Sequence, residues 1–205
     1  MASSIDTYGE LKTEIASWMA RTDLTSKMDL FVQLAESAFN RTLRVPEMVA
    51  TDDAFVVSAK RTAAPTGYLE MISARISVGG QWRDLDIEVV RQQVLMRGSY
   101  SGTPCTFSII GQEIEVSPPP DGSYTLGLDY YEKIATITGS DAGTNDVLAA
   151  HPDLYLFRSL MNAAAFMRDE GRMATFAAAY QGVVGDIKIA LRKSKQSTAM
   201  QVKAV

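Results

Sequence analysis

The chain has 205 residues, a formal net charge of -4 at pH 7 and an ordinary composition, 46% hydrophobic and 21% charged. A chain of this length and hydrophobicity can bury a core as one large or two small domains, which excludes wholesale disorder. The acidic balance argues against a protein that holds nucleic acid by its phosphates, because such proteins usually carry a basic face.

The first fifty residues predict a pair of amphipathic helices. Thr7 and Glu10 have the spacing of a capping box, in which each side chain bonds the backbone of the other residue at a helix start. Apolar residues then recur every three or four positions, first as far as Arg21 and again up to Pro46. A proline cannot continue a helix, so Pro46 ends the second one.

From about Thr51 the pattern changes to short strands. Gly79-Gly80 and Gly111-Gln112 each separate two apolar runs, which is typical of a β-hairpin. The run from Tyr124 to Tyr130 alternates apolar and polar residues, as a half-buried strand does. Residues 86–97 are ambiguous, and the spacing of their valines favours a short helix.

The stretch from Pro152 to Lys193 predicts a hairpin of two long helices with a break near Glu170-Gly171. A proline in the first helical turn costs nothing, because its missing N–H would have no partner there. Apolar residues recur at helical spacing in both halves. The tail after Lys195 is polar and without periodicity, and we expect it to be mobile.

This order of elements predicts an α+β fold that is mainly helical. The N-terminal and C-terminal helix pairs pack into one helical bundle, and an antiparallel β subdomain protrudes from it. The expected divisions are residues 1–50 for the first helix pair, 51–145 for the β-rich subdomain, 146–193 for the C-terminal helical hairpin and 194–205 for the mobile tail.

The segments that direct a protein to a membrane are missing from the pattern. The N-terminus lacks the basic-then-apolar layout of a signal peptide. No apolar run approaches the roughly 20 residues that span a bilayer. The single cysteine excludes an internal disulfide and a cysteine-rich zinc site. We therefore expect a protein made in the cytoplasm, with no membrane partner.

No catalytic, cofactor-binding or metal-binding set stands out. His151, the only histidine, could be a general base or a metal ligand, but its place at a helix start explains it better. Cys105 could be a nucleophile only beside a histidine, and a small buried filler is the simpler interpretation. The hairpin glycines lack the lysine and the strand-to-helix context of a phosphate loop. We expect no enzyme and no cofactor.

Two features suggest contact surfaces. Glu36, Arg41 and Arg44 on the second helix could form an ion-pair network or a partner face, although a solvated helix face is the simpler alternative. Gly182 and Gly185 lie inside the last helix, where each costs about 1 kcal/mol relative to alanine. The close approach of another backbone, within the subunit or across an interface, would offset that cost.

The C-terminal segment is basic on an acidic chain. It carries Arg192, Lys193, Lys195 and Lys203, and no acidic residue follows Asp186. One explanation is an arm that becomes ordered on a partner. The other is a helix end that favours cations, followed by a solvated tail.

Short motifs follow one another in a fixed order along nearly the whole chain. On the N-terminal helices they are Tyr8, Leu11, Ile15, Trp18, Arg21, Asp23 and Leu24, then Phe31, Leu34, Ala35 and Glu36, then Asn40, Arg41, Leu43, Arg44 and Val45. Further on they are Tyr68-Leu69-Glu70, Pro118-Pro119-Pro120, Tyr130-Tyr131, Pro152-Asp153-Leu154-Tyr155-Leu156 and Asp169-Glu170. Together these motifs resemble the head-to-tail adaptor, or connector, proteins of tailed bacteriophages.

The resemblance implies a virion structural protein at the head-tail interface, without enzymatic activity. Such adaptors assemble as a closed ring of about twelve copies beneath the portal protein. The ring extends the DNA channel and offers the attachment site for tail proteins or a second connector. The resemblance also implies that the helical bundle forms the ring wall and that Arg192, Lys193 and Lys195 dock on the portal.

The charge of the chain is compatible with this role. Repeated in every copy, a net charge of -4 makes a ring acidic, so double-stranded DNA should pass without tight binding. The main alternative is a small-molecule-binding protein or an enzyme with its pocket in the β region, which would need convergent polar groups that the sequence does not offer. A third alternative is an assembly chaperone or a regulatory module that uses the basic tail.

Overall fold

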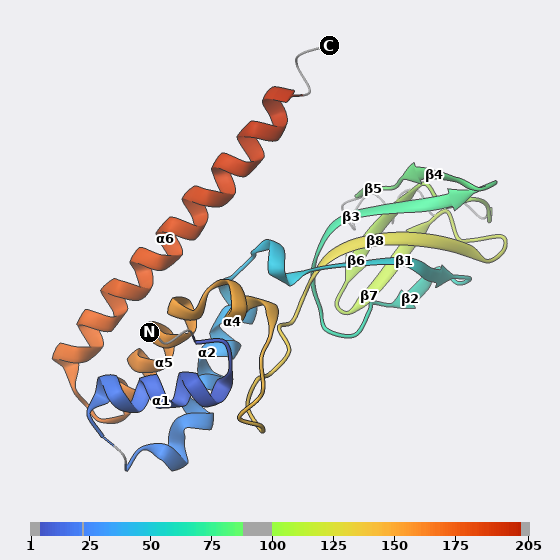
Figure 1. Ribbon diagram of the computed structural model, residues 1–205. Coiled ribbons are helices and arrows are strands. Elements are labelled where there is room, and N and C mark those ends of the chain that lie inside the picture. Colours follow the sequence, from blue (N-terminus) through green and yellow to red (C-terminus); the bar gives the residue numbers. More distant parts are fainter. Residues whose placement is uncertain (1–4, 22, 88–99, 202–205) are drawn as a thin grey trace. The chain divides into compact units, whose positions relative to one another are not determined.

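The computed structural model of the protein describes residues 5–21, 23–87 and 100–201, of which residues 194–201 are described by their backbone alone (Figure 1). The chain divides into two compact units. We call residues 1–47 together with 134–205 the helical unit, and residues 48–133 the β unit.

The helices of the helical unit are α1 (Tyr8–Met19), α2 (Met28–Thr42), α4 (Asp146–Ala150), α5 (Pro152–Phe166) and α6 (Glu170–Gln201). The predicted capping box is confirmed at the start of α1: the Thr7 hydroxyl accepts the Glu10 N–H, and the Glu10 carboxylate accepts the Thr7 N–H. A 3-10 turn, Thr25–Lys27, precedes α2, and another, Pro46–Met48, follows it. Pro152 occupies the first turn of α5, as the sequence predicts.

One face of each longer helix forms the core of the helical unit. The fully buried side chains include Tyr8, Leu11 and Ile15 of α1, Phe31, Ala35 and Phe39 of α2, and Leu154, Tyr155, Leu160 and Ala164 of α5. The ring of Phe39 lies 5.0 Å from that of Tyr155 and 6.5 Å from that of Tyr180 on α6. Three helices therefore meet at this aromatic cluster.

The C-terminal helical hairpin is confirmed, with its break slightly earlier than expected. α5 ends at Phe166 and α6 begins at Glu170, and Arg168 between them takes a left-handed conformation with φ of 57°. α6 then continues as far as Gln201. It therefore includes residues 196–201, where the sequence shows no apolar periodicity.

The strands of the β unit form two sheets of four (Figure 1). The first sheet has the order β1 (Val49–Val57), β8 (Tyr124–Glu132), β3 (Tyr68–Val78) and β4 (Gln81–Asp84). The second has the order β2 (Arg61–Ala63), β7 (Glu113–Ser117), β6 (Thr106–Ile110) and β5 (Asp86–Ile87). Residues of both sheets share one core, which includes Ile76, Leu126 and Leu128 of the first and Phe107, Ile114 and Val116 of the second.

The expectation of a mainly helical fold is wrong. Helices account for 44% of the structure and strands for 27%, the strands forming two four-stranded sheets, so the protein is an α+β protein and not a mainly helical bundle. Bulges explain why the sequence understates the strands. The register of β1 shifts between Asp52 and Phe55, and that of β3 shifts between Tyr68 and Glu70 and again between Met71 and Ser73. Each shift breaks the two-residue alternation by which a strand is recognised.

The hairpin predictions are confirmed and one helix prediction is not. Gly79 and Gly80 join β3 to β4, and Gly111 begins the turn from β6 to β7, all three with positive φ. Residues 86–97 were expected to form a short helix. Asp86–Ile87 is instead the strand β5, which pairs in parallel with β6, and the rest of that helix lies outside the described residues.

An ion pair crosses the first sheet at a glycine. Arg75 on β3 donates to Asp53 on β1 over 2.8 Å, and the two side chains meet above Gly127 of the central strand β8. A Cβ atom at Gly127 would lie 2.6 Å from Arg75 Nε and 2.7 Å from Asp53 Oδ1. The ion pair is possible in this position because residue 127 has no side chain.

Gly127→Ala should therefore lower the free energy of unfolding of the β unit by about 1–3 kcal/mol, the usual cost of overfilling a packed site. The measurement is urea unfolding followed by the fluorescence of Trp82. Gly122→Ala is the matched control in the same unit, because a Cβ there meets no atom within 4 Å. Equal stabilities of the two variants would show that Arg75 and Asp53 move aside at no cost.

Candidate functional site

The two residues that the sequence offers for catalysis belong to different units, His151 to the helical unit and Cys105 to the β unit. His151 precedes the first turn of α5, and its Nε2 lies 3.6 Å from the Glu47 carboxylate. Cys105 is exposed in the β unit, so its interpretation as a buried filler is wrong. Among the described residues, no group of three histidine, cysteine, aspartate or glutamate side chains is placed to hold a metal ion. Of the helices in that part of the chain, none is long and apolar enough to cross a membrane.

Glu36, a candidate interface residue, is committed to the interior of the helical unit. Its side chain is buried, and its carboxylate accepts the Ile137 N–H over 2.9 Å and the Thr136 hydroxyl over 2.8 Å. Burial raises the pKa of this carboxyl, and the two hydrogen bonds offset part of that rise. Nearby, Asn40 accepts the Ile134 N–H over 3.0 Å. Together Glu36 and Asn40 fasten residues 134–137 to α2.

The two candidate arginines of this helix have different surroundings. Arg44 lies past the end of α2 and donates to the carbonyls of Leu43, over 2.6 Å, and Asn40, over 3.3 Å. It thus satisfies acceptors that the helix end leaves open. Arg41 is exposed and lines a groove between α2 and α6.

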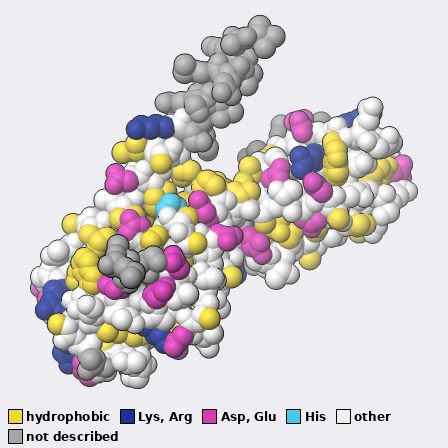
Figure 2. Space-filling model, viewed as in Figure 1, with side chains coloured by type: hydrophobic (Ala, Val, Ile, Leu, Met, Phe, Trp, Pro, Cys, Tyr) yellow, Lys and Arg dark blue, Asp and Glu magenta, His cyan; other side chains and the backbone are white. Residues whose placement is uncertain are grey.

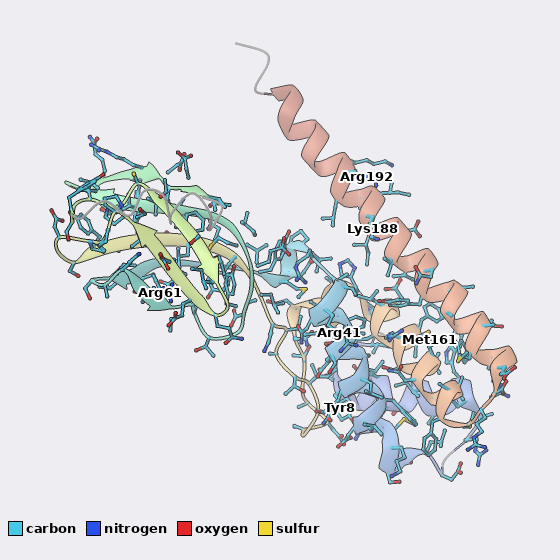
Figure 3. The ribbon with its side chains drawn as sticks, turned by 180° about the vertical axis from the view of Figure 1, so that it is seen from behind. Tyr8, Arg41, Arg61, Met161, Lys188 and Arg192 are labelled. Carbon is cyan, nitrogen blue, oxygen red and sulfur yellow. The ribbon has the colours of Figure 1, made fainter. Side chains whose placement is uncertain are left out.

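We call this groove, with a volume of about 480 Å³, the basic groove. Its charged lining residues are Arg41, Arg44, Arg158 and Lys188, and no acidic side chain lines it. Figure 3 shows Arg41 on α2 and Lys188 on α6. The guanidinium of Arg158 lies 5.5 Å from the ring centre of Tyr180, within reach of a cation–π interaction. Its Nε atom is buried and has no hydrogen-bond partner.

A second groove of similar size, about 490 Å³, lies along α6 and carries the opposite charge. We call it the acidic groove. Its acidic lining residues are Glu47, Asp153 and Asp186, and His151 is its one basic group. Figure 2 shows acidic side chains beside the histidine on this face. The Oε2 atom of Glu47 is buried and lies 3.6 Å from His151 Nε2, and it accepts no hydrogen bond from the described residues.

The sequence of α6 explains why the two grooves differ. Successive residues of an α-helix are about 100° apart, so Asp186 and Lys188 project to opposite flanks. Ile187 and Leu191 lie between the flanks and line both grooves. Opposite charges two residues apart on a helix could have been noticed in the sequence, but the partners that complete each groove, Arg158 and Glu47, come from distant segments.

The remaining candidates lie on the exposed side of α6. A Cβ atom at Gly182 or Gly185 would meet no described atom within 4 Å, so no other described segment approaches either glycine closely. Arg192 and Lys193 are exposed and are the last residues whose side chains are described. Figure 3 shows Arg192 on α6. Lys195 belongs to α6 by its backbone, and its side chain lies outside the described part.

A family model described as SU10 adaptor protein matches residues 6–203, nearly the whole chain and both units. No curated protein matches the sequence.

Proposed function

The chain belongs to the SU10 adaptor protein family, a family of phage head-to-tail adaptors, and from this premise we propose that its copies form a ring beneath the portal protein. The family implies a structural protein of the virion with a non-enzymatic role and contacts with portal and tail proteins. In the proposal, the ring extends the DNA channel and provides the attachment site for the tail.

The family match over residues 6–203 is the observation that carries this proposal. The surface of the helical unit supports it. A closed ring requires two different faces on each subunit, because the contact between neighbours is head-to-tail. The basic and acidic grooves supply two such faces. Both grooves lie in the helical unit, so they give no support to the alternative of a ligand pocket in the β region.

The portal contact is proposed at the basic end of α6. Arg192 and Lys193 are exposed, and no ion pair joins either to another described residue. With Lys195 they form a cationic helix segment that suits an acidic surface. Gly182, Gly185 and Arg41 remain the candidates for contacts between copies, whereas Glu36 and Arg44 make contacts within the subunit.

The test mixes the purified protein with portal rings and measures the mass of the complex by light scattering. Wild-type protein should add several copies to each portal ring. The double variant Arg192→Glu with Lys193→Glu should bind at least about tenfold more weakly, since each contact turns from attractive to repulsive. Lys27→Glu with Arg83→Glu, two exposed cations elsewhere, makes the same change in net charge and should bind like the wild type.

Two results would count against the proposal. If the wild-type chain leaves portal rings unchanged in mass, the adaptor function fails. If the control variant loses binding as fully as the α6 variant, net charge governs the contact and α6 has no specific role. We also expect DNA binding to be weak and salt-sensitive at most, because the chain is acidic.

A further inference from the structure

We propose that the two flanks of α6 are the two halves of the contact between neighbouring copies, with the acidic groove of one copy facing the basic groove of the next. The inference rests on the ring proposed above and adds the residues that hold it together. The central pairs join Asp186 and Asp153 of one copy to Lys188 and Arg41 of its neighbour.

The charges on both flanks are available for such a contact. Arg41, Lys188, Asp153 and Asp186 are exposed, and within the described part of the chain none of them takes part in an ion pair. The helical unit thus leaves opposite charges unused on opposite sides of one helix.

Each groove also holds one buried polar atom that lacks a hydrogen-bond partner. Among the described residues, it is Nε of Arg158, a donor, in the basic groove, and Oε2 of Glu47, an acceptor, in the acidic groove, where His151 Nε2 faces it from 3.6 Å without a hydrogen bond. Buried donors and acceptors are nearly always satisfied in folded proteins. A neighbouring copy would bring acceptors to the first groove and donors to the second.

The presence of both a basic and an acidic groove favours a second copy of this chain over a partner that carries only one sign of charge. An acidic peptide would suit the basic groove only, and a cationic partner would suit the acidic groove only. Because Asp186 and Lys188 project to opposite flanks, the proposed contact uses one flank of a copy and leaves its other flank for the next copy. Each copy therefore meets two neighbours, which gives a head-to-tail series that closes into a ring. The apolar residues that both grooves share, Ile187 and Leu191, supply nonpolar surface on each side.

Charge-reversal variants test the pairing, because the loss of association expected for each single variant can be restored in two ways. Lys188→Glu places a carboxylate in the basic groove and Asp186→Lys places an ammonium in the acidic groove, so in either variant a central pair becomes repulsive. Either variant alone should self-associate at least about tenfold more weakly than the wild type. An equimolar mixture of the two should recover association, since each variant then offers the flank that the other lacks. The double variant Asp186→Lys with Lys188→Glu exchanges the two flanks and should also associate.

The measurement is sedimentation velocity at high protein concentration, with a carbodiimide cross-link between lysine and carboxylate side chains as a second readout. Digestion of cross-linked wild-type oligomers should yield a peptide that joins the Lys188 segment to the Asp186 or Asp153 segment of another copy. Circular dichroism should show the same helix content in every variant, because both positions are exposed.

The outcomes separate this inference from the proposed function. If the single variants associate as the wild type does, or the mixture does not recover, the pairing is wrong even where wild-type protein binds portal rings. If the mixture recovers and portal rings are not bound, the pairing holds and the adaptor function fails. Absence of wild-type self-association and of the cross-link, both in free protein and on portal rings, would overturn the pairing.

Discussion

Replacing Glu36 by alanine should lower the free energy of unfolding of the helical unit by about 2–3 kcal/mol, the cost of leaving buried donors without an acceptor. The carboxylate accepts the Ile137 N–H and the Thr136 hydroxyl, and alanine would leave both donors without this acceptor. The segment they belong to would then lose part of its attachment to α2. Urea unfolding followed by Trp18 fluorescence, in a Trp82→Phe background, measures the loss in the helical unit.

Glu36→Gln is the matched control, and it adds a pH dependence of known sign. The amide keeps the size of the side chain and one acceptor oxygen, so we expect a loss of about 1 kcal/mol. Burial raises the pKa of Glu36 above its ordinary value of 4.5. The folded state therefore favours the protonated carboxyl, whose contribution is fully present below pH 4.5 and is lost as the pH rises through the folded-state pKa.

The glutamine variant lacks this titration. The stability of the wild type relative to Glu36→Gln should accordingly be highest in mild acid and fall as the pH rises toward neutrality. If the difference between the two proteins rises with pH, the pKa of Glu36 is lowered in the fold. If Glu36→Ala is as stable as the wild type, the side chain is not the attachment that its geometry indicates.

Local rules account for the elements that the sequence predicts correctly. The Thr7–Glu10 capping box, the proline at position 152 and the glycines of the two hairpin turns each act over a few residues, so their effect is visible in the sequence itself. The extent of β1 and β3 is not local in this sense. Their bulges are defined by pairing with the strand β8. At its bulges, β3 is separated from β8 by more than fifty residues of sequence, and β1 is separated from β8 by more than that. The parallel pairing of β5 with β6 likewise depends on the path of the chain between them.

The candidate contact residues of α2 and the grooves beside α6 likewise depend partly on local pattern and partly on distant segments. A helical pattern places Glu36, Arg41 and Arg44 on one helix but does not say which of them other segments cover. Residues 136 and 137 approach Glu36 from about a hundred residues away, which makes it internal, whereas nothing similar reaches Arg41. Hydrophobic periodicity correctly predicts α6, yet the grooves beside it also need Arg158 from α5 and Glu47 from the turn after α2.

Phe39→Ala should have the largest effect of any single substitution considered for this chain, a loss of about 3–5 kcal/mol in the stability of the helical unit. The Phe39 ring is completely buried, and it contacts Tyr155 edge to face and Tyr180 in a stacked arrangement. Alanine would remove both aromatic contacts and leave a cavity where α2, α5 and α6 meet. Tyr180 and Phe176 are the buried aromatic side chains described on α6. Loss of the contact between Phe39 and Tyr180 should therefore destabilise the packing of the helix that lines both grooves.

Two further substitutions make this result specific. Leu34→Ala lies on the same helix with 47% of the side chain exposed, and its stability should stay within about 0.5 kcal/mol of the wild type. Phe39→Leu keeps most of the volume without the ring and should fall between the two. Hydrogen exchange should increase around Tyr180 in Phe39→Ala and stay unchanged in Leu34→Ala. If exchange near Tyr180 is the same in both, α6 is held by contacts other than this cluster, and the two grooves do not depend on it.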